Sequence, residues 1–210
     1  MNVTVVGTGE MGSALVTLLA PRHRVTWVGR TAESAAAKVA SLPSHLPVQA
    51  ADVHDALRAD VIILALWHRD MVPFVQRHAD ALQGQVVVDI ANPFTEDFED
   101  FFTPFETSAA EILQAAIPES TVVGAFKNTF AAVFTQPDFT EGASDVLITS
   151  NDEAARQLVM ELLAHVPFRV LDAGMLSNNR TIERMTLLSR EVGRRHGFTK
   201  RLAYRMLGQP

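Results

Sequence analysis

The 210-residue sequence contains no cysteine. This excludes disulfide bonds, thiolate metal ligands, iron–sulfur clusters and cysteine nucleophiles, and it is compatible with a reducing compartment, so we expect a cytoplasmic protein. Long apolar runs are also missing. The densest run, 61–67, is far shorter than the roughly 18 residues of a membrane-spanning helix. No basic leader precedes the first apolar run, and the formal charge of −6 argues against a general nucleic-acid binder.

Tyrosine and tryptophan are scarce, with one and two residues, whereas phenylalanine occurs twelve times. Nine of the twelve lie between Phe94 and Phe139. The acidic, Phe-rich stretch 95–106 has no clear helical or strand period. We therefore expect a loop or short helix at the surface there, with a lid as one possible role.

Short β-branched runs alternate with Ala- and Leu-rich stretches through the first 125 residues. The runs are almost wholly apolar, as expected for parallel strands buried on both faces. This βαβα order predicts a Rossmann-type α/β fold with a doubly wound, mostly parallel sheet and right-handed crossovers. The expected strands are 2–6, 24–28, 48–50, 61–66, 86–90 and 121–125, and the expected helices are 11–19, 32–41, 52–57, 70–82 and 108–116.

The pattern continues as a small C-terminal α/β extension. We expect strands at 146–149 and 168–171, a helix at 152–165 and a long terminal helix at 176–196. Residues 1–125 should form the Rossmann domain, and residues 126–210 should complete its sheet within one compact unit. The apolar positions of the terminal helix predict a stripe that faces the core or the partner in a homodimer: Leu176, Ile182, Met185, Leu188 and Val192.

Charge is uneven along the chain: from Arg180 onward there are eight basic residues and two acidic ones. A solvated helix end, with its cations placed where the helix dipole favours them, would account for this. A patch that receives an anionic ligand or partner is the alternative.

The strongest chemical signal is a glycine-rich turn directly after the first expected strand, Gly7-Thr8-Gly9-Glu10-Met11-Gly12. Gly7 permits a sharp turn, Gly9 lets a pyrophosphate approach the backbone, and Gly12 allows close packing of helix on strand. The helix N-terminus offers N–H groups and a positive dipole end to phosphates. In this context the motif predicts a dinucleotide site.

The end of the second strand predicts which dinucleotide binds. It reads Gly29-Arg30-Thr31 and lacks the acidic residue that would accept hydrogen bonds from an NAD ribose. Arg30 can pair with a 2′-phosphate, and Thr31 can donate a further hydrogen bond or cap the next helix. We therefore predict NADP(H) rather than NAD(H).

Ligands of open parallel sheets lie outside the carboxyl ends of the strands. At the end of the fourth strand, Leu66 and Trp67 are expected to flank the ribose and nicotinamide, although core packing would also explain Trp67. His68, which follows, is either a proton donor or simply the start of a helix. At the end of the fifth strand, Asn92 could hydrogen-bond the carboxamide or the substrate, and Pro93 stiffens the turn.

After the sixth strand the chain places ammonium, amide and hydroxyl groups beside apolar rings, at Phe126, Lys127, Asn128 and Thr129. That mixture suits a flat, partly polar heterocycle. We find no Ser/His/Asp arrangement, no histidine pair with metal-ligand spacing and no other catalytic residue. Hydride transfer between two bound rings needs only positioning and exclusion of water. The absence therefore weakens a hydroxy-acid dehydrogenase, which would need a base such as a Lys or His close to the carbonyl.

Four segments together resemble the NADPH-dependent reductases of coenzyme F420, and the oxidoreductase domains of the STEAP metalloreductases are similar. These segments are 7–12 (GTGEMG), 28–31 (VGRT), 125–131 (AFKNTFA) and 171–180 (LDAGMLSNNR). The resemblance implies that the glycine turn and Arg30–Thr31 hold NADP, and that Phe126–Thr129 border the acceptor. The acceptor would be F420, FMN or FAD, and residues 126–210 would complete its pocket.

The chain departs from that pattern at Lys127, where the family often has Asn, at Met175, often Pro, and at Gly29, often Ser. These departures leave NADP binding intact and the acceptor open. Two alternative functions also stay open. One is a small imine or keto-acid reductase of the pyrroline-carboxylate type, and the other is a non-catalytic module that senses NADP(H).

Overall fold

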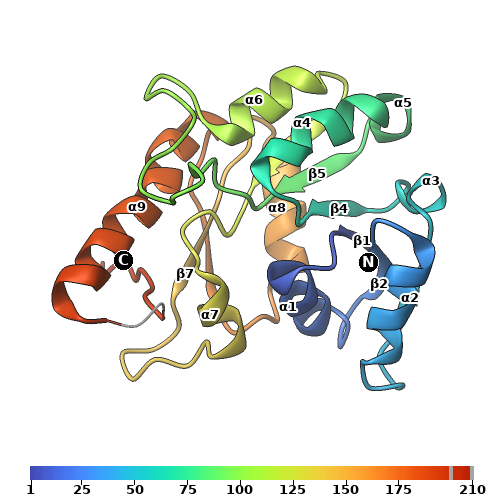
Figure 1. Ribbon diagram of the computed structural model, residues 1–210, viewed down its shortest axis with the longest axis horizontal. Coiled ribbons are helices and arrows are strands. Elements are labelled where there is room, and N and C mark those ends of the chain that lie inside the picture. Colours follow the sequence, from blue (N-terminus) through green and yellow to red (C-terminus); the bar gives the residue numbers. More distant parts are fainter. Residues whose placement is uncertain (199–200, 209–210) are drawn as a thin grey trace.

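Six parallel strands form the central sheet of the computed structural model, which describes residues 1–198 and 201–208 (Figure 1). Their order, β3-β2-β1-β4-β5-β6, places β1 and β4 side by side at the point where the winding direction reverses. The strands are β1 Asn2–Val6, β2 Arg24–Val28, β3 Val48–Ala50, β4 Val61–Leu64, β5 Val86–Asp89 and β6 Thr121–Gly124. The predicted Rossmann-type sheet is confirmed, although β4 ends two residues earlier than expected.

A second sheet continues the first. It pairs β7 (Asp145–Ile148) with β8 (Arg169–Asp172) in parallel. An antiparallel bridge between Gly124 and Thr149, with N–H···O distances of 2.9 and 3.0 Å, joins it to the end of β6. A Cβ on Gly124 would lie 2.4 Å from the side-chain amide nitrogen of Asn179, so this junction needs a glycine. The C-terminal segment therefore adds a two-stranded sheet at the end of β6.

Helices connect the strands, and most lie where the sequence predicts them. The expected helix 70–82 is divided at His78, whose backbone leaves helical geometry, and a short helix after β6 was not predicted. The helices are α1 Glu10–Leu19, α2 Ala32–Ala40, α3 Val53–Ala56, α4 His68–Arg77, α5 Ala79–Leu82, α6 Ala109–Ala116, α7 Ala131–Thr135, α8 Glu153–Leu162, the 3₁₀ turn η1 Leu176–Asn178 and α9 Asn179–His196.

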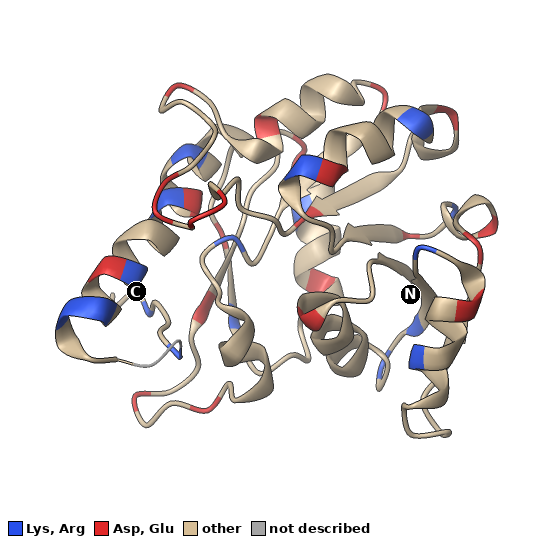
Figure 2. Ribbon diagram, in the orientation of Figure 1, with Lys and Arg blue, Asp and Glu red and all other residues tan. Residues whose placement is uncertain are grey.

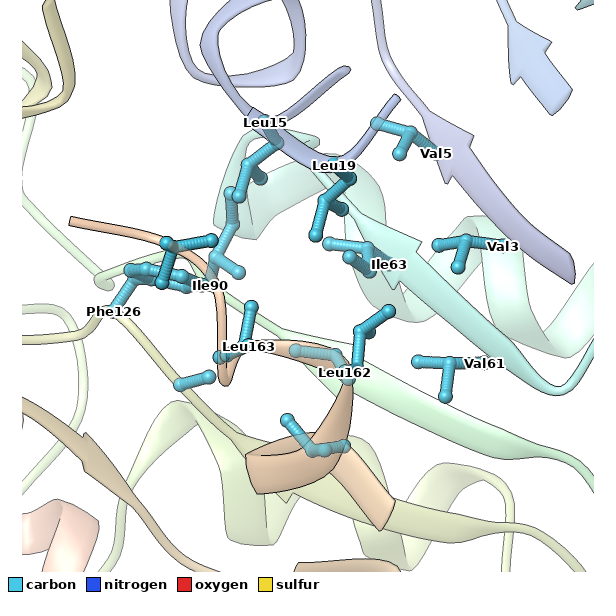
Figure 3. Close-up of a cluster of buried hydrophobic side chains, with 14 of the residues drawn as sticks. Val3, Val5, Leu15, Leu19, Val61, Ile63, Ile90, Phe126, Leu162 and Leu163 are labelled. Atoms are coloured by element: carbon cyan, nitrogen blue, oxygen red, sulfur yellow. The ribbon is translucent and has the colours of Figure 1, made fainter. Parts of the chain in front are cut away.

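The sheet is covered on both faces, because successive strand side chains point to opposite sides. Val3, Val5 and Ile63 pack with side chains of α1 and α8 on one face, and Figure 3 shows Leu15 and Leu162 converging there. The other face, which includes Val6, Ile62 and Leu64, packs against α3, α4, α5 and α6. Burial on both sides explains the unbroken apolar runs in the sequence.

The terminal helix matches its expected stripe only in part. Leu176 and Ile182 are buried, but Leu188 is 59% exposed and Val192 is exposed too. The buried face of α9 is mainly polar: Asn179, Glu183, Thr186, Ser189 and Gly193. In the second half of the helix the core-facing alternative is therefore wrong, because Ser189 and Gly193 face the core there. The partner-facing alternative for Leu188 and Val192 stays a prediction.

Most basic residues of α9 have partners within the chain. Arg180 pairs with Glu111 at 2.5 Å and Arg190 with Glu99 at 3.5 Å, whereas Arg194 and Arg195 pair with Glu191 of the same helix. Salt bridges of this kind neutralise much of the local positive charge. They favour a solvated helix end over a free anion-binding patch.

Candidate active site at the carboxyl edge of the sheet

The glycine turn between β1 and α1 has no room for side chains at two of its three glycines. Gly7 has a φ of +118°, and a Cβ there would lie 2.2 Å from the carbonyl oxygen of Ala65. A Cβ on Gly12 would lie 2.1 Å from the carbonyl oxygen of Gly7. At Gly9 nothing lies within 4 Å of the Cβ position. The turn therefore packs tightly on the chain after β4 and leaves open space at Gly9.

That space lies at the start of α1. Gly9 is the N-cap residue and has no side chain to accept a hydrogen bond from the first-turn N–H groups. Those groups have no acceptor inside the helix, so they offer a binding site for an anion. Thr8 is half-buried, Glu10 is exposed and Met11 is partly buried against the core. A cradle without side chains next to a free helix N-terminus fits the pyrophosphate of a dinucleotide.

The end of β2 presents its cation to solvent. Arg30 is exposed, and Gly29 lies so close to α2 that a Cβ would be 2.4 Å from Ser34 Oγ. Thr31 caps α2: its Oγ accepts a hydrogen bond from the N–H of Ser34, and its hydroxyl donates to the Glu33 carboxylate. The capping role of Thr31 is confirmed; donation from its hydroxyl to a phosphate would replace the bond to Glu33 and stays a prediction.

The chain after β4 passes beneath the glycine turn and then becomes exposed. Ala65 contacts the turn, Leu66 is half-buried and Trp67 is 60% exposed at the N-cap of α4. The guanidinium of Arg69 lies 5.9 Å from the centre of the Trp67 ring. The exposure of Trp67 excludes the core-packing interpretation of this residue.

His68 is the first residue of α4 and is half-buried. Burial lowers the pKa of His68 below its ordinary value of 6.5; the carboxylate of Asp89 opposes this shift, and the Lys127 ammonium adds to it. The imidazole is therefore neutral at pH 7.

Asp89, Lys127 and Glu183 form a buried ionic cluster at the carboxyl ends of β5 and β6. The Lys127 ammonium is fully buried and donates hydrogen bonds to Asp89 at 2.6 Å, to Glu183 at 3.1 Å and to the carbonyl oxygen of Ala91. Burial opposes the charge of Lys127, but the two carboxylates outweigh it and raise its pKa. Burial raises the pKa of Glu183, the ammonium opposes this rise, and Asp89 adds to it.

The cluster connects four elements. Asp89 ends β5, Lys127 follows β6, and Glu183 comes from α9. Glu183 also accepts hydrogen bonds from the first two N–H groups of α6, at Ala109 and Ala110, over 3.1 and 3.4 Å. The ammonium thus fixes the ends of two strands relative to two helices.

Asn92 and Pro93 are held by the same arrangement. The Asn92 side-chain amide donates to the carbonyl oxygen of Lys127 at 2.8 Å and to Thr186 Oγ1 at 3.3 Å, and Pro93 is buried. The structure therefore brings Asn92 beside the segment after β6, and its contact with a ligand stays a prediction.

All four predicted acceptor residues have buried side chains. Phe126 adopts a φ of +57° and packs its ring 5.0 Å from Phe134 and 6.0 Å from Phe168. Asn128 donates to the backbone at the start of β7 over 2.8 Å, and Thr129 is buried as well. Contact between this segment and an acceptor stays a prediction.

Residues 94–106, which we refer to as the strap, lie between β5 and α6 in the sequence, and Figure 2 shows them as the acidic loop beside the basic helix α9. The strap has no helix, and a bridge between Phe94 and Phe101 closes it. Arg184 lies 5.5 Å from the Phe101 ring centre and 3.8 Å from that of Phe105, and it donates to the Thr103 carbonyl oxygen at 2.7 Å. The strap is thus attached to α9, and its surface position confirms the expectation of a loop.

Sequence reasoning missed Asp89, Glu183, Arg184 and Arg190. A signal existed for Glu183, because it is one of two acidic residues in a strongly basic helix and lies four residues after Asn179 on the same face. The arginine–phenylalanine contacts had no comparable signal, because they join segments about 85 residues apart in the sequence.

The comparisons with known proteins show the family of this chain. The family model described as NADP oxidoreductase, coenzyme F420-dependent, matches residues 2–93, which contain the glycine turn and the ends of β2, β4 and β5. The F420-dependent NADP reductase of Methanocaldococcus jannaschii is 31% identical in an alignment of 195 positions, and the match covers 87% of each chain. The chain belongs to this family.

Two further proteins are similar to this chain. A solved structure from Arthrobacter sp. FB24, described as a putative F420-dependent NADP-reductase, superposes with a TM-score of 0.82 at 25% identity, covering 93% of this chain and 94% of that one. Human metalloreductase STEAP2 is 31% identical over 133 residues, which are 63% of this chain but 26% of STEAP2. The predicted family, the Rossmann fold and the assignment to NADP-dependent oxidoreductases are confirmed.

Proposed function

We propose that the chain binds NADP(H) at the glycine turn and transfers hydride between NADPH and a deazaflavin (F420) or flavin acceptor. The cradle at Gly7, Gly9 and Gly12 carries this proposal, because it combines tight packing with an uncapped helix N-terminus. Thr8, Glu10 and Met11 complete the turn. When bound, the nicotinamide would supply the chemistry of hydride exchange with the acceptor ring.

The protein's part is to bind and orient. Arg30 and Thr31, next to Gly29, would hold the 2′-phosphate through a guanidinium and a hydroxyl that both reach solvent. Leu66 and Trp67 would flank the nicotinamide, because the residue before them, Ala65, touches the glycine turn. Asn92 and Pro93 would limit the site on the far side.

The acceptor side would lie beside Phe126, Lys127, Asn128 and Thr129, whose buried side chains fix the backbone at this edge. The M. jannaschii relative is named for F420, which supports a deazaflavin; FMN and FAD are the flavin alternatives. An imine or keto-acid reductase is a second candidate, because His68 directly follows Trp67 at this strand end; its neutral imidazole would have to take up a proton before it could donate one. A non-catalytic NADP(H) sensor is the third.

We also propose a cytoplasmic homodimer. None of the helices in the described ranges is long and apolar enough to cross a membrane. Leu188 and Val192 on α9 are exposed apolar residues that a second copy could cover. Sedimentation analysis tests the dimer: a Leu188→Glu protein should sediment as a monomer.

The cofactor proposal is tested with Arg30→Asp and the matched control Arg22→Asp, which replaces an exposed cation before the opposite end of β2. We expect Arg30→Asp to weaken NADPH binding by at least about tenfold, with NADH affected less, because a carboxylate repels the 2′-phosphate. The control should bind NADPH like the wild type. Unchanged NADPH affinity in Arg30→Asp would contradict the proposal.

The acceptor is identified by following NADPH oxidation with F420, FMN, FAD and a cyclic imine in parallel. Turnover with F420 or a flavin supports the main proposal, and turnover with the imine alone supports the second candidate. Tight NADPH binding without turnover on any of them supports the sensor.

A further inference from the structure

Two aromatic side chains stand exposed where the cofactor cradle meets the strap. Trp67 is 60% exposed and Phe98 is 41% exposed, and their rings contact edge to face at 6.2 Å and 65°. Trp67 belongs to the end of β4, and Phe98 lies in the strap. Two elements that are separate in the sequence therefore present one continuous aromatic surface.

This surface adjoins the cradle. Ala65, two residues before Trp67, is the residue that a Cβ on Gly7 would strike. A ligand that extends from the glycine turn along the carboxyl edge of the sheet therefore reaches Trp67 next.

The strap holds Phe98 in an unfavourable backbone conformation. Phe98 has a φ of +60°, and in the described part of the chain Phe126 is the other non-glycine residue with positive φ. A bulky residue in this region costs free energy and indicates a local constraint. The Phe98 N–H donates to the Thr95 carbonyl oxygen at 2.9 Å, and this turn presents the ring toward Trp67.

Arg190 and Phe94 support the Phe98 ring. The Arg190 guanidinium of α9 lies 5.7 Å from the Phe98 ring centre and 5.9 Å from that of Phe94, and the two rings are 5.5 Å apart. Arg190 also pairs with Glu99 at 3.5 Å. Phe98 is thus exposed but held on three sides, as expected of a preorganised contact for a ligand.

We propose that Trp67 and Phe98 form a stacking wall for the planar ring system of the acceptor, so that these two side chains select a flat tricyclic ring. This inference rests on the proposed function for the place of the cofactor. Exposed aromatic faces gain most from a flat, extended ring, because offset stacking and edge contacts add to the buried apolar area. A small aliphatic imine would cover little of either side chain.

The test uses the two tryptophans of the chain. Trp27 is buried and its indole N–H donates to the Gly7 carbonyl oxygen at 2.9 Å, so it serves as an internal reference. The full chain, saturated with NADP⁺, is titrated with FMN and separately with F420 while tryptophan fluorescence is recorded. We expect saturable quenching in the wild type, and a much smaller amplitude in Trp67→Phe, where Trp27 alone remains.

Phe98→Leu keeps an apolar side chain but removes the ring, and Phe102→Leu is the matched control in the same strap, 64% exposed. We expect Phe98→Leu to raise the FMN and F420 dissociation constants roughly fivefold to tenfold. Phe102→Leu should equal the wild type, and neither variant should change NADPH affinity. Equal quenching in wild type and Trp67→Phe with both ligands, or equal affinities in both leucine variants, overturns the proposal.

The outcome separates the two proposals. If Arg30→Asp keeps its NADPH affinity while FMN or F420 quenches Trp67, the cofactor site fails and the stacking wall is supported. If Arg30→Asp loses NADPH and neither ligand quenches Trp67, the cofactor site is supported and the wall is overturned.

Discussion

Replacing Lys127 with methionine tests the buried ionic cluster. The side chain keeps a similar length but loses the charge, so Asp89 and Glu183 lose a shared partner inside the protein. Removing one member of a buried ion pair destabilises a protein by about 3–5 kcal/mol. Each carboxylate keeps one hydrogen bond in the variant, which reduces the destabilisation. The Ala91 N–H still donates to Asp89 at 2.9 Å, and the Ala109 N–H still donates to Glu183 at 3.1 Å.

We therefore expect the free energy of unfolding to fall by about 3 kcal/mol, at the lower end of that range. In a chain of this size each kcal/mol shifts the melting temperature by about 2–4 °C, which predicts a fall of roughly 6–12 °C. Thermal unfolding followed by circular dichroism measures it. Arg195→Met, which removes an exposed cation paired with Glu191, is the control and should melt like the wild type.

The size of the effect should depend on pH. Loss of the ammonium raises the pKa of Glu183 further above its ordinary value of 4.5, because Lys127 opposes the effect of burial in the wild type. A carboxyl group whose pKa is raised by folding stabilises the fold as long as the pH is below its ordinary pKa. This contribution is lost as the pH rises through the folded-state pKa. Lys127→Met should therefore lose more stability relative to the wild type at pH 8 than at pH 5. Adding Glu183→Gln should make the losses at the two pH values more alike. A Lys127→Met protein that melts within about 2 °C of the wild type at pH 8 would refute this reasoning.

Three glycine substitutions and one histidine substitution test other parts of the site. Gly9→Ala should keep the melting temperature of the wild type, because its Cβ position is open. The same variant should bind NADPH about tenfold more weakly, as measured by calorimetry. Tight NADPH binding would contradict a pyrophosphate at this turn. Gly12→Ala and Gly124→Ala, whose Cβ atoms would lie 2.1 and 2.4 Å from their neighbours, should each lower stability by about 1–3 kcal/mol in urea unfolding. His68→Gln should reduce the loss of stability on acidification from pH 7 to 5. Burial lowers the pKa of His68 in the fold, so the stability it contributes above its ordinary pKa of 6.5 is lost as the pH falls. Urea titrations at pH 7 and pH 5 measure this. Equal losses of stability in His68→Gln and the wild type would contradict the expectation.

The sequence was sufficient for the fold because its strongest patterns are local. Apolar runs without alternation predicted the parallel strands, and the glycine turn and the Thr31 cap were found at their positions. The end of β4 was placed too late, because Ala65 and Leu66 are as apolar as the strand they follow. The division of the helix at His78 was also missed, since no proline or glycine marks it.

The part of the site that depends on distant contacts was not predictable in the same way. Lys127 was expected to face the acceptor, but its place in the fold is fixed by Glu183, 56 residues later. A lysine among polar residues gives no sign of whether a carboxylate will neutralise it inside the protein. The exposure of Trp67 and its contact with Phe98 likewise depend on how the strap crosses the edge of the sheet.

The contacts of Glu183 also affect how the chain folds during synthesis. The residue binds the Lys127 ammonium and the first N–H groups of α6, all from the part of the chain that leaves the ribosome much earlier. Until α9 has emerged, the α6 N–H groups lack this acceptor and the ammonium has only Asp89 and the Ala91 carbonyl oxygen, so the nucleotide-binding half completes its packing late in translation. A chain that stops before α9 keeps a partly neutralised buried lysine and an incompletely capped helix, and such a product would be a substrate for quality-control proteases.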